Sequence, residues 1–128
     1  MRLLLDTQAF LWAASAPERL SPRARRAIEA GSNEVFLSAA SVWEIAIKTQ
    51  IGRLHLTRDL EDFVPERMAE RALVALPVLM SHVIKIAALP DVHRDPFDRL
   101  LVAQAIVEDL HLVTADRRLR DYSVKVVW

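Results

Sequence analysis

Residues 2–6, Arg2-Leu3-Leu4-Leu5-Asp6, place an acidic side chain directly after a short apolar run. Residues 112–116, Leu112-Val113-Thr114-Ala115-Asp116, repeat this arrangement near the other end of the chain. Continuous apolar runs of this length are typical of strands that are buried on both faces, as in parallel sheets. The two segments therefore predict two strands of one parallel sheet, each followed by an aspartate at its carboxyl end.

Helical stretches alternate with further short strands along the rest of the chain. We expect strands over residues 2–5, 34–37, 73–78, 111–114 and 124–127. We expect helices over residues 7–15, 22–31, 38–50, 59–71, 81–88 and 95–109, of which the second begins at Ser21-Pro22. Strands that alternate with helices indicate an α/β fold, in which a mainly parallel, roughly five-stranded sheet lies between two layers of helices.

The composition suits one domain and excludes several kinds of site. The chain has 128 residues, of which 52% are hydrophobic, and it contains no cysteine. This size fits a single domain over residues 1–128, and the lack of cysteine excludes disulfides and thiolate metal sites. The apolar run at residues 3–5 is too short for a signal peptide or a membrane span, so we expect a cytoplasmic protein with no membrane contact.

The charge of the chain is balanced, with 17 basic and 17 acidic residues. A protein that binds nucleic acid through non-specific attraction is usually basic overall. Any contact with nucleic acid must therefore come from local basic patches, or through metal ions that reverse the sign of an acidic site.

Three carboxylates in the predicted elements have a reason to lie close together. Asp6 and Asp116 follow strands of one parallel sheet, which brings both acids to the same edge. Glu44 lies in an apolar helical stretch over residues 42–47, where an unpartnered carboxylate is costly to bury. Each acid also has a purely structural interpretation: the two aspartates as helix caps, and Glu44 as the i,i+4 partner of Lys48.

A fourth carboxylate lies at the start of the long apolar helix. Asp95 precedes Pro96, which suits the first position of a helix, so we interpret Asp95 as the N-cap. Asp98 then falls in the first turn, where the helix dipole favours an anion. We expect Asp98 to be functional and Asp95 to be structural, and we leave open that Asp95 shares a contact to metal or water.

Carboxylates that crowd together repel one another and raise one another's pKa values, and divalent cations relieve this repulsion. Ligand sets made only of oxygen favour Mg²⁺ or Mn²⁺ over Zn²⁺. Such a site suits phosphodiester hydrolysis, because metal ions activate a water and stabilise the leaving oxygen. Four carboxylates alone leave a phosphatase or a DNA nuclease as alternatives.

Four motifs follow one another along the chain: LLDT at residues 4–7, LSAASVWEI at 37–45, HRDPFDRLLVAQA at 93–105 and LVTAD at 112–116. Together they resemble the motifs of PIN-domain proteins, and more closely those of VapC-type toxins, over nearly the whole chain. The resemblance implies that the catalytic and metal-binding acids are Asp6, Glu44, Asp98 and Asp116. It also implies a Mg²⁺- or Mn²⁺-dependent endoribonuclease that forms a homodimer and is inhibited by a cognate antitoxin protein.

Neighbours of the four acids are candidate supporting residues. By the same resemblance, Thr114 matches a position that often carries a hydroxyl near the metal. Lys48 shares a helix face with Glu44 and would offset surplus negative charge. We interpret Ser38 first as a helix-start residue, with a place near the metal as the alternative.

Basic side chains near the third and fourth acids are candidate phosphate contacts. Such groups beside a metal site can hold RNA phosphates, and three arginines suit this role, Arg94, Arg99 and Arg117. A solvated, ion-paired surface is the alternative for each of them. The four histidines lack the spacing of a zinc site, and we interpret them as ordinary polar or capping residues.

The aromatic residues Phe10, Trp12 and Trp43 are expected in the core, with an exposed dimer or antitoxin surface as the alternative.

The alternative function is a catalytically silent PIN-like module that binds RNA or protein. The complete set of acids argues against this alternative, because buried carboxylates are costly in a domain that only binds.

Overall fold

The apolar run at the start of the chain forms the central strand of a five-stranded sheet. In the computed structural model, which describes residues 1–128, the strands are β1 (Arg2–Leu5), β2 (Glu34–Ser38), β3 (Val74–Leu76), β4 (His111–Val113) and β5 (Val126–Val127). Their order across the sheet is β3-β2-β1-β4-β5, and every neighbouring pair is parallel. The predicted α/β class and the parallel sheet are confirmed.

Six α-helices connect the strands: α1 (Thr7–Ser15), α2 (Pro22–Glu29), α3 (Ala39–Gln50), α4 (Leu60–Glu70), α5 (Met80–Ile86) and α6 (Pro96–Val107). Two short 3₁₀ helices cover Pro17–Arg19 and Arg117–Asp121. Local capping sets several helix starts: Ser21 accepts a hydrogen bond from the backbone of Ala24 and so caps α2, as predicted. None of the helices has both the length and the apolar character that crossing a bilayer requires.

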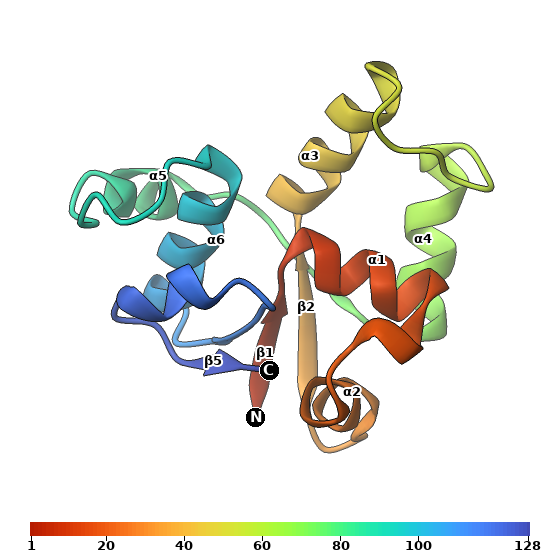
Figure 1. The fold of residues 1–128 in the computed structure, drawn as a ribbon, viewed down its shortest axis with the longest axis horizontal. Helices are drawn as coiled ribbons and strands as arrows, with labels where there is room; N and C mark the ends of the chain where they lie inside the picture. Colours follow the sequence, from red (N-terminus) through yellow and green to blue (C-terminus); the bar gives the residue numbers. More distant parts are fainter.

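The alternation of side chains along β1 divides the core into two halves. Leu3 and Leu5 pack with apolar side chains of α1, α2 and α4, whereas Leu4 packs with those of α6. All three leucines are fully buried, which contributes about 1.5–3 kcal/mol for each side chain. Figure 1 shows the resulting layers, with α1, α2 and α4 on one side of the strands and α5 and α6 on the other.

The two edge strands are shorter than the sequence predicts. The expected strands over residues 73–78 and 124–127 contract to Val74–Leu76 and Val126–Val127. Both lie at the edges of the sheet, where only one neighbouring strand supplies hydrogen bonds. Pro77 directly after β3 has no N–H group to continue the pairing.

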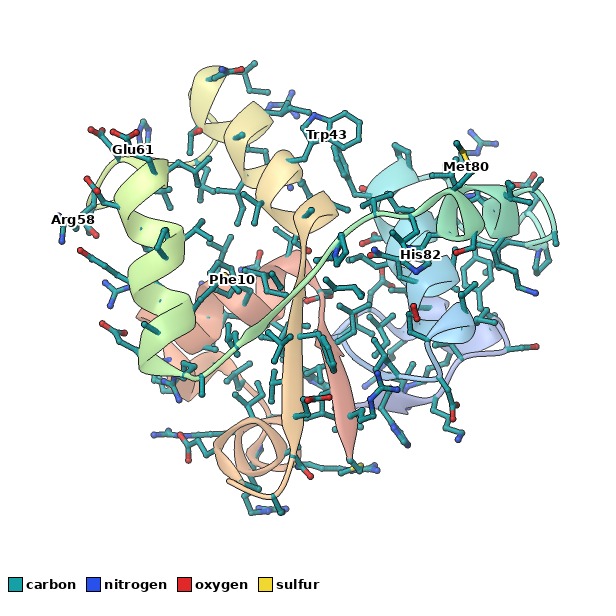
Figure 2. All side chains as sticks on the ribbon, turned by 180° about the vertical axis from the view of Figure 1, so that it is seen from behind. Phe10, Trp43, Arg58, Glu61, Met80 and His82 are labelled. Carbon is teal, nitrogen blue, oxygen red and sulfur yellow. The ribbon has the colours of Figure 1, made fainter.

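Trp43 is the exception among the aromatic residues that we expect in the core. Phe10 is 1% exposed and packs edge-on against Phe63, and Trp12 is partly buried on the same half of the core. Trp43 is 59% exposed, and its ring packs against that of Phe97, with 4.9 Å between the ring centroids. The prediction for Trp43 is wrong because α3 extends beyond the carboxyl end of β2, where one side of the helix faces away from the core (Figure 2).

Candidate active site

The carboxyl ends of β1 and β4 meet where the strand order reverses. The chain passes from β1 to β2 on one side and returns later to β4 on the other, which leaves a crevice beyond the two strand ends. The backbone N–H of Asp6 donates to the carbonyl of Val113 at 3.0 Å, so pairing continues one residue past β1. Asp6 and Asp116 therefore lie at the same edge of the sheet, as predicted.

Asp6 both caps a helix and lines the crevice. Its Oδ1 accepts a hydrogen bond from the backbone N–H of Ala9 at 2.7 Å, which satisfies one of the free donors at the start of α1. The residue is only 8% exposed, and the nearby Thr114 hydroxyl acts to lower the pKa of its carboxyl group. The structural and functional interpretations of Asp6 are compatible, because capping engages only one of its two carboxylate oxygens.

Glu44 is buried in α3, and two donors hold its carboxylate. Its Oε1 accepts a hydrogen bond from the Thr7 hydroxyl at 2.6 Å, and its Oε2 accepts one from the Lys48 ammonium at 2.6 Å. The predicted pair with Lys48 is confirmed. Thr7 was missing from the sequence-based candidates, and it links the first turn of α1 to α3.

The start of α6 carries two neighbouring acids with different surroundings. Asp95 accepts hydrogen bonds at its Oδ1 from the backbone N–H groups of Phe97 at 2.9 Å and Asp98 at 3.0 Å, which confirms it as the N-cap. Asp98 lies in the first turn of the helix, and its Oδ2 is 3.5 Å from the Nε2 of His93. Both acids line the crevice, so capping does not remove Asp95 from it.

Asp116 is surrounded by donors from its own loop and from the loop before α6. The Arg118 side chain donates from Nε to Oδ1 at 3.1 Å and from a terminal nitrogen to Oδ2 at 3.0 Å. The Nε2 of His93 lies 3.0 Å from the same Oδ2. The Thr114 hydroxyl accepts a hydrogen bond from the backbone N–H of Asp116 at 3.0 Å, so Thr114 contacts both strand-end aspartates.

The acids described above line one cleft of about 380 Å³. Its lining includes all four candidate acids, Asp6, Glu44, Asp98 and Asp116. Asp95 and Lys48 complete the charged part of the lining. The fold therefore brings together carboxylates that are separated by up to about a hundred residues in the sequence.

Burial and crowding raise the pKa values of two of the acids. Burial raises the pKa of Asp6 to about 6, and the negative charges of Glu44 and Asp116 add to the shift. Burial also raises the pKa of Asp98 to about 7, with further contributions from the charges of Asp95 and Asp6. Ionising these two groups therefore costs more free energy than ionising an ordinary aspartate, and a positive charge in the cleft would lower that cost.

Asp116 differs from the other acids because it is paired with a cation of the protein. Hydrogen bonds from Arg118 lower the pKa of Asp116 to about 2, and the hydrogen bond with His93 acts in the same direction. The cleft thus combines one fully ionised carboxylate with two that resist ionisation. Groups whose pKa values diverge within one cleft are typical of functional sites.

The sequence of the chain matches a known family over nearly its whole length. The family model for the PIN domain matches residues 3–125. The chain belongs to the PIN domain family. It is 34% identical over 121 residues to Ribonuclease VapC22 of Mycobacterium tuberculosis, and this match covers 94% of the chain and 91% of that relative.

Solved structures share the PIN fold of this chain. VapBC2 from Rickettsia felis, crystallised with a DNA fragment from its promoter, superposes with a TM-score of 0.73 at 13% identity, over 98% of this chain and 97% of that one. FitAcB from Neisseria gonorrhoeae superposes with a TM-score of 0.59 at 23% identity, over 97% of this chain and 95% of that one. The three-layer arrangement is therefore common to proteins of very different sequence.

Ser38 lies outside the cleft of this PIN domain. It is fully buried at the start of α3, where its hydroxyl accepts a hydrogen bond from the backbone of Ala40 at 3.0 Å and donates to Gln104 at 2.6 Å. The capping interpretation is confirmed. Because the hydroxyl is engaged between α3 and α6, the structure argues against the alternative place near a metal.

The three candidate arginines have different surroundings in this PIN domain. Arg94 and Arg117 are exposed, beside Asp95 and Asp116 in the sequence. The partly buried guanidinium of Arg99 instead donates to three backbone carbonyls and one hydroxyl, those of Ile86, Pro90, His93 and Tyr122. Arg99 therefore fixes the loop before α6, and its occupied guanidinium argues against the predicted phosphate contact.

His93 lies beside the cleft, although the sequence predicts only an ordinary polar residue at this position. It is 8% exposed and lies between Asp98 and Asp116. Its neighbours are carboxylates from distant segments, so a search for zinc-type histidine spacing misses it. The sequence does contain one indication of its role, because His93 lies two residues before Asp95, the cap of the helix that carries Asp98.

Proposed function

We propose that this PIN domain is a divalent-metal-dependent endoribonuclease, the toxin of a toxin–antitoxin pair. The observation that carries the proposal is the convergence of four carboxylates, Asp6, Glu44, Asp98 and Asp116, in one cleft. Such an arrangement is unfavourable without a cation, because burial and mutual repulsion oppose ionisation. The cleft is therefore suited to a positively charged ligand.

The donor set fits Mg²⁺ or Mn²⁺. The four acids offer only carboxylate oxygens, which these cations prefer over the nitrogen and sulfur ligands of zinc sites. The raised pKa values of Asp6 and Asp98 support this fit, since a bound cation favours the ionised form of each. Such a metal, when bound, supplies Lewis acidity that activates water and stabilises charge on the scissile phosphate.

The surrounding side chains hold the acids in position. The Thr7 hydroxyl and the Lys48 ammonium each donate to one oxygen of Glu44, so this buried carboxylate keeps a fixed direction. Thr114 contacts both Asp6 and Asp116. Because these donors are fixed before any substrate arrives, the acids need little rearrangement on binding.

Exposed basic residues beside the cleft are suited to the RNA backbone. We assign Arg94 and Arg117 to phosphates that flank the scissile one, since both side chains are exposed and neither forms an ion pair. With a net charge of +0, the chain lacks a general attraction to nucleic acid. Local contacts of this kind must therefore position the substrate.

RNA is the proposed substrate because the relative at 34% identity, aligned over nearly all of both chains, is named a ribonuclease. The proposed partner is an antitoxin protein, because VapBC2 and FitAcB share the fold and the sequence resembles VapC-type toxins. An RNA-cleaving toxin of this kind acts where cellular RNA lies, and we place the chain in the cytoplasm.

We also propose that the chain forms a homodimer. Helix α5 exposes three large apolar side chains, Met80 at 77%, Val83 at 50% and Ile84 at 67%. Met80 at the start of this helix is labelled in Figure 2. Clusters of exposed apolar side chains mark protein contact surfaces. Light scattering on the purified chain should give the mass of a dimer, and Ile84→Lys should give a monomer. A monomeric unsubstituted chain would remove this part of the proposal.

The test of the nuclease is cleavage by the purified chain with Mg²⁺, with Mn²⁺ and with EDTA. The substrates are single-stranded RNA, structured RNA, DNA of the same sequence and a phosphomonoester. Asp6→Asn and Asp98→Asn should abolish cleavage of RNA. Asp62→Asn makes the same change at an exposed residue of α4 and should retain it.

The outcomes of this experiment separate the possible functions. Metal-dependent cleavage of RNA that only the two cleft variants lose would support the nuclease. Cleavage of DNA or of the phosphomonoester in preference to RNA would show that the proposed substrate is wrong and that the chain is a DNA nuclease or a phosphatase. Binding of RNA without cleavage under any metal would favour the catalytically silent binding module.

A further inference from the structure

His93 lies between two carboxylates of the cleft that come from different parts of the chain. Its Nε2 is 3.0 Å from the Oδ2 of Asp116 and 3.5 Å from the Oδ2 of Asp98. One potential ligand atom from each of the three residues lies within 4.8 Å of the others. From these distances alone, His93 would be taken for a third ligand of a metal ion.

The hydrogen bond at the other ring nitrogen argues against that assignment. The backbone N–H of Asp95 donates to the Nδ1 of His93 at 3.0 Å. A nitrogen that accepts a hydrogen bond carries a lone pair, so in the neutral ring the proton is on Nε2. A metal ligand needs a lone pair at the coordinating atom, and Nε2 has none in this tautomer. The nitrogen that faces the two aspartates is therefore a donor.

The surrounding loop keeps the ring in this orientation. The backbone N–H of His93 donates to the Tyr122 hydroxyl at 2.9 Å, and Arg99 donates to the carbonyl of His93 at 3.4 Å. The residue is 8% exposed, so water does not readily replace these contacts. Turning the ring to present a free Nε2 would break the hydrogen bond from Asp95 and leave a buried N–H without a partner.

We propose that His93 is a positioning residue of the metal site, which donates from Nε2 to Asp116 and holds that carboxylate facing Asp98. The proposal rests on the proposed function, because it assigns His93 to the same divalent cation. A neutral ring supplies this hydrogen bond without adding a positive charge that would compete with the cation. Arg118, the other partner of Asp116, carries such a charge and is exposed. Hydrogen-bond partners of metal ligands typically contribute a factor of about 10–100 in metal affinity.

The test measures Mn²⁺ binding to the full chain by calorimetry, with three variants of His93. His93→Leu removes the donor, and we expect the affinity for Mn²⁺ to fall by about 10–100-fold. His93→Gln places an amide N–H close to the position of Nε2, and it should restore the affinity to within a few-fold. His93→Asn places its amide nearer the position of Nδ1 and should not. His55→Leu, at an exposed histidine outside the cleft, is the matched control and should leave the affinity unchanged.

Thermal unfolding without metal identifies any variant that does not fold. If His93→Leu is unfolded, the comparison of His93→Gln with His93→Asn distinguishes a positioning role from a purely structural one. A purely structural role would not distinguish the metal affinities of two folded amide variants. The NMR signals of the ring nitrogens give an independent readout, and we expect the Nε2–H tautomer of His93 both without metal and with Mg²⁺.

Three results would overturn the proposal in different ways. Unchanged Mn²⁺ affinity in His93→Leu would remove the positioning role and leave the metal site intact. A change of His93 to the Nδ1–H tautomer on addition of Mg²⁺ would make it a ligand instead. Failure of the unsubstituted chain to bind Mn²⁺ would overturn the metal-dependent function itself, and this inference with it.

Discussion

At the scale of single residues, Asp98 is subject to opposing influences. It lies in the first turn of α6, where the helix dipole favours its charge, yet burial and the neighbouring acids raise its pKa to about 7. In the unfolded chain its pKa is 3.8. Between these values the native state keeps a proton that the unfolded chain has released, so the stability of the metal-free protein depends on pH.

We predict that the metal-free protein loses stability as the pH rises from about 4 to about 7. In this range the native state binds more protons than the unfolded state, so the free energy of unfolding falls. Asp6, with a pKa of about 6, acts in the same direction. The stabilising contribution of Asp116 is lost only as the pH falls towards about 2, outside this range.

The Asp98→Asn variant isolates the contribution of this one residue. We expect it to exceed the unsubstituted protein in unfolding free energy by roughly 1–3 kcal/mol at neutral pH, after allowance for partial exposure, and to match it near pH 4. Urea unfolding in metal-free buffer at both pH values measures the difference. A difference that does not change with pH would contradict the raised pKa of Asp98.

Thr7 offers a second prediction at this scale, because its hydroxyl donates to the buried Glu44. Thr7→Val keeps the shape of the side chain and removes the donor. We expect the free energy of unfolding to fall by about 1–3 kcal/mol and the affinity for Mn²⁺ to fall as well. Thr7→Ser retains the hydroxyl and is the matched control. Calorimetry measures the affinity for Mn²⁺, and urea unfolding measures the free energy of unfolding. An unchanged affinity in Thr7→Val would show that Thr7 contributes to stability but not to metal binding.

At the scale of elements, the start of α6 combines structure and function in a few residues. Asp95 caps the helix, Pro96 occupies its first position, and Asp98 follows in the first turn. The loop before the helix is held by Arg99 and places the Nε2 of His93 3.0 Å from Asp116, one of the acids that line the cleft. A cap that fixes the first turn therefore also fixes the direction in which Asp98 enters the cleft.

Substitutions of Asp95 test whether helix capping is the whole role of this residue. Asp95→Ala removes the acceptor of two backbone hydrogen bonds, and we expect the free energy of unfolding to fall by about 0.5–2 kcal/mol. Asp95→Asn keeps an acceptor and should be nearly as stable as the unsubstituted protein. Cleavage assays on the two variants then separate the roles. An inactive but fully stable Asp95→Asn would show that the charge of Asp95 has a function beyond the cap.

The elements that were predicted well are those that local signals define. Ser21-Pro22 and Asp95-Pro96 begin helices through caps and proline geometry, which depend only on neighbouring residues. The lengths of the edge strands and the exposure of Trp43 depend instead on which elements lie alongside. No local pattern contains that information, and the predictions for these elements failed.

At the scale of the whole molecule, the cleft is assembled from both layers of helices. Asp6 and Glu44 come from the side of α1 and α3, whereas Asp98 comes from α6 and Asp116 from the loop after β4. The four acids were predictable because each has a recognisable place at a strand end or in an apolar helix. Thr7 and His93 were not, because their roles depend on partners 37 and 23 residues away in the sequence.

A cation that joins both layers should stabilise the whole fold. We predict that Mn²⁺ at about a hundred times its dissociation constant raises the free energy of unfolding by about 2.7 kcal/mol, and that EDTA reverses the effect. Thermal unfolding with and without metal measures it. Asp6→Asn should lose the response, whereas Asp62→Asn should keep it. Equal responses in both variants would place the stabilising metal elsewhere.

The central claim is that the four carboxylates meet at one divalent cation, and anomalous diffraction from crystals grown with Mn²⁺ tests it most directly. We predict an anomalous peak within the cleft, among Asp6, Glu44, Asp98 and Asp116. The exposed acidic group formed by Asp59, Glu61 and Asp62 provides an internal comparison. A peak at that surface group with none in the cleft would contradict the claim.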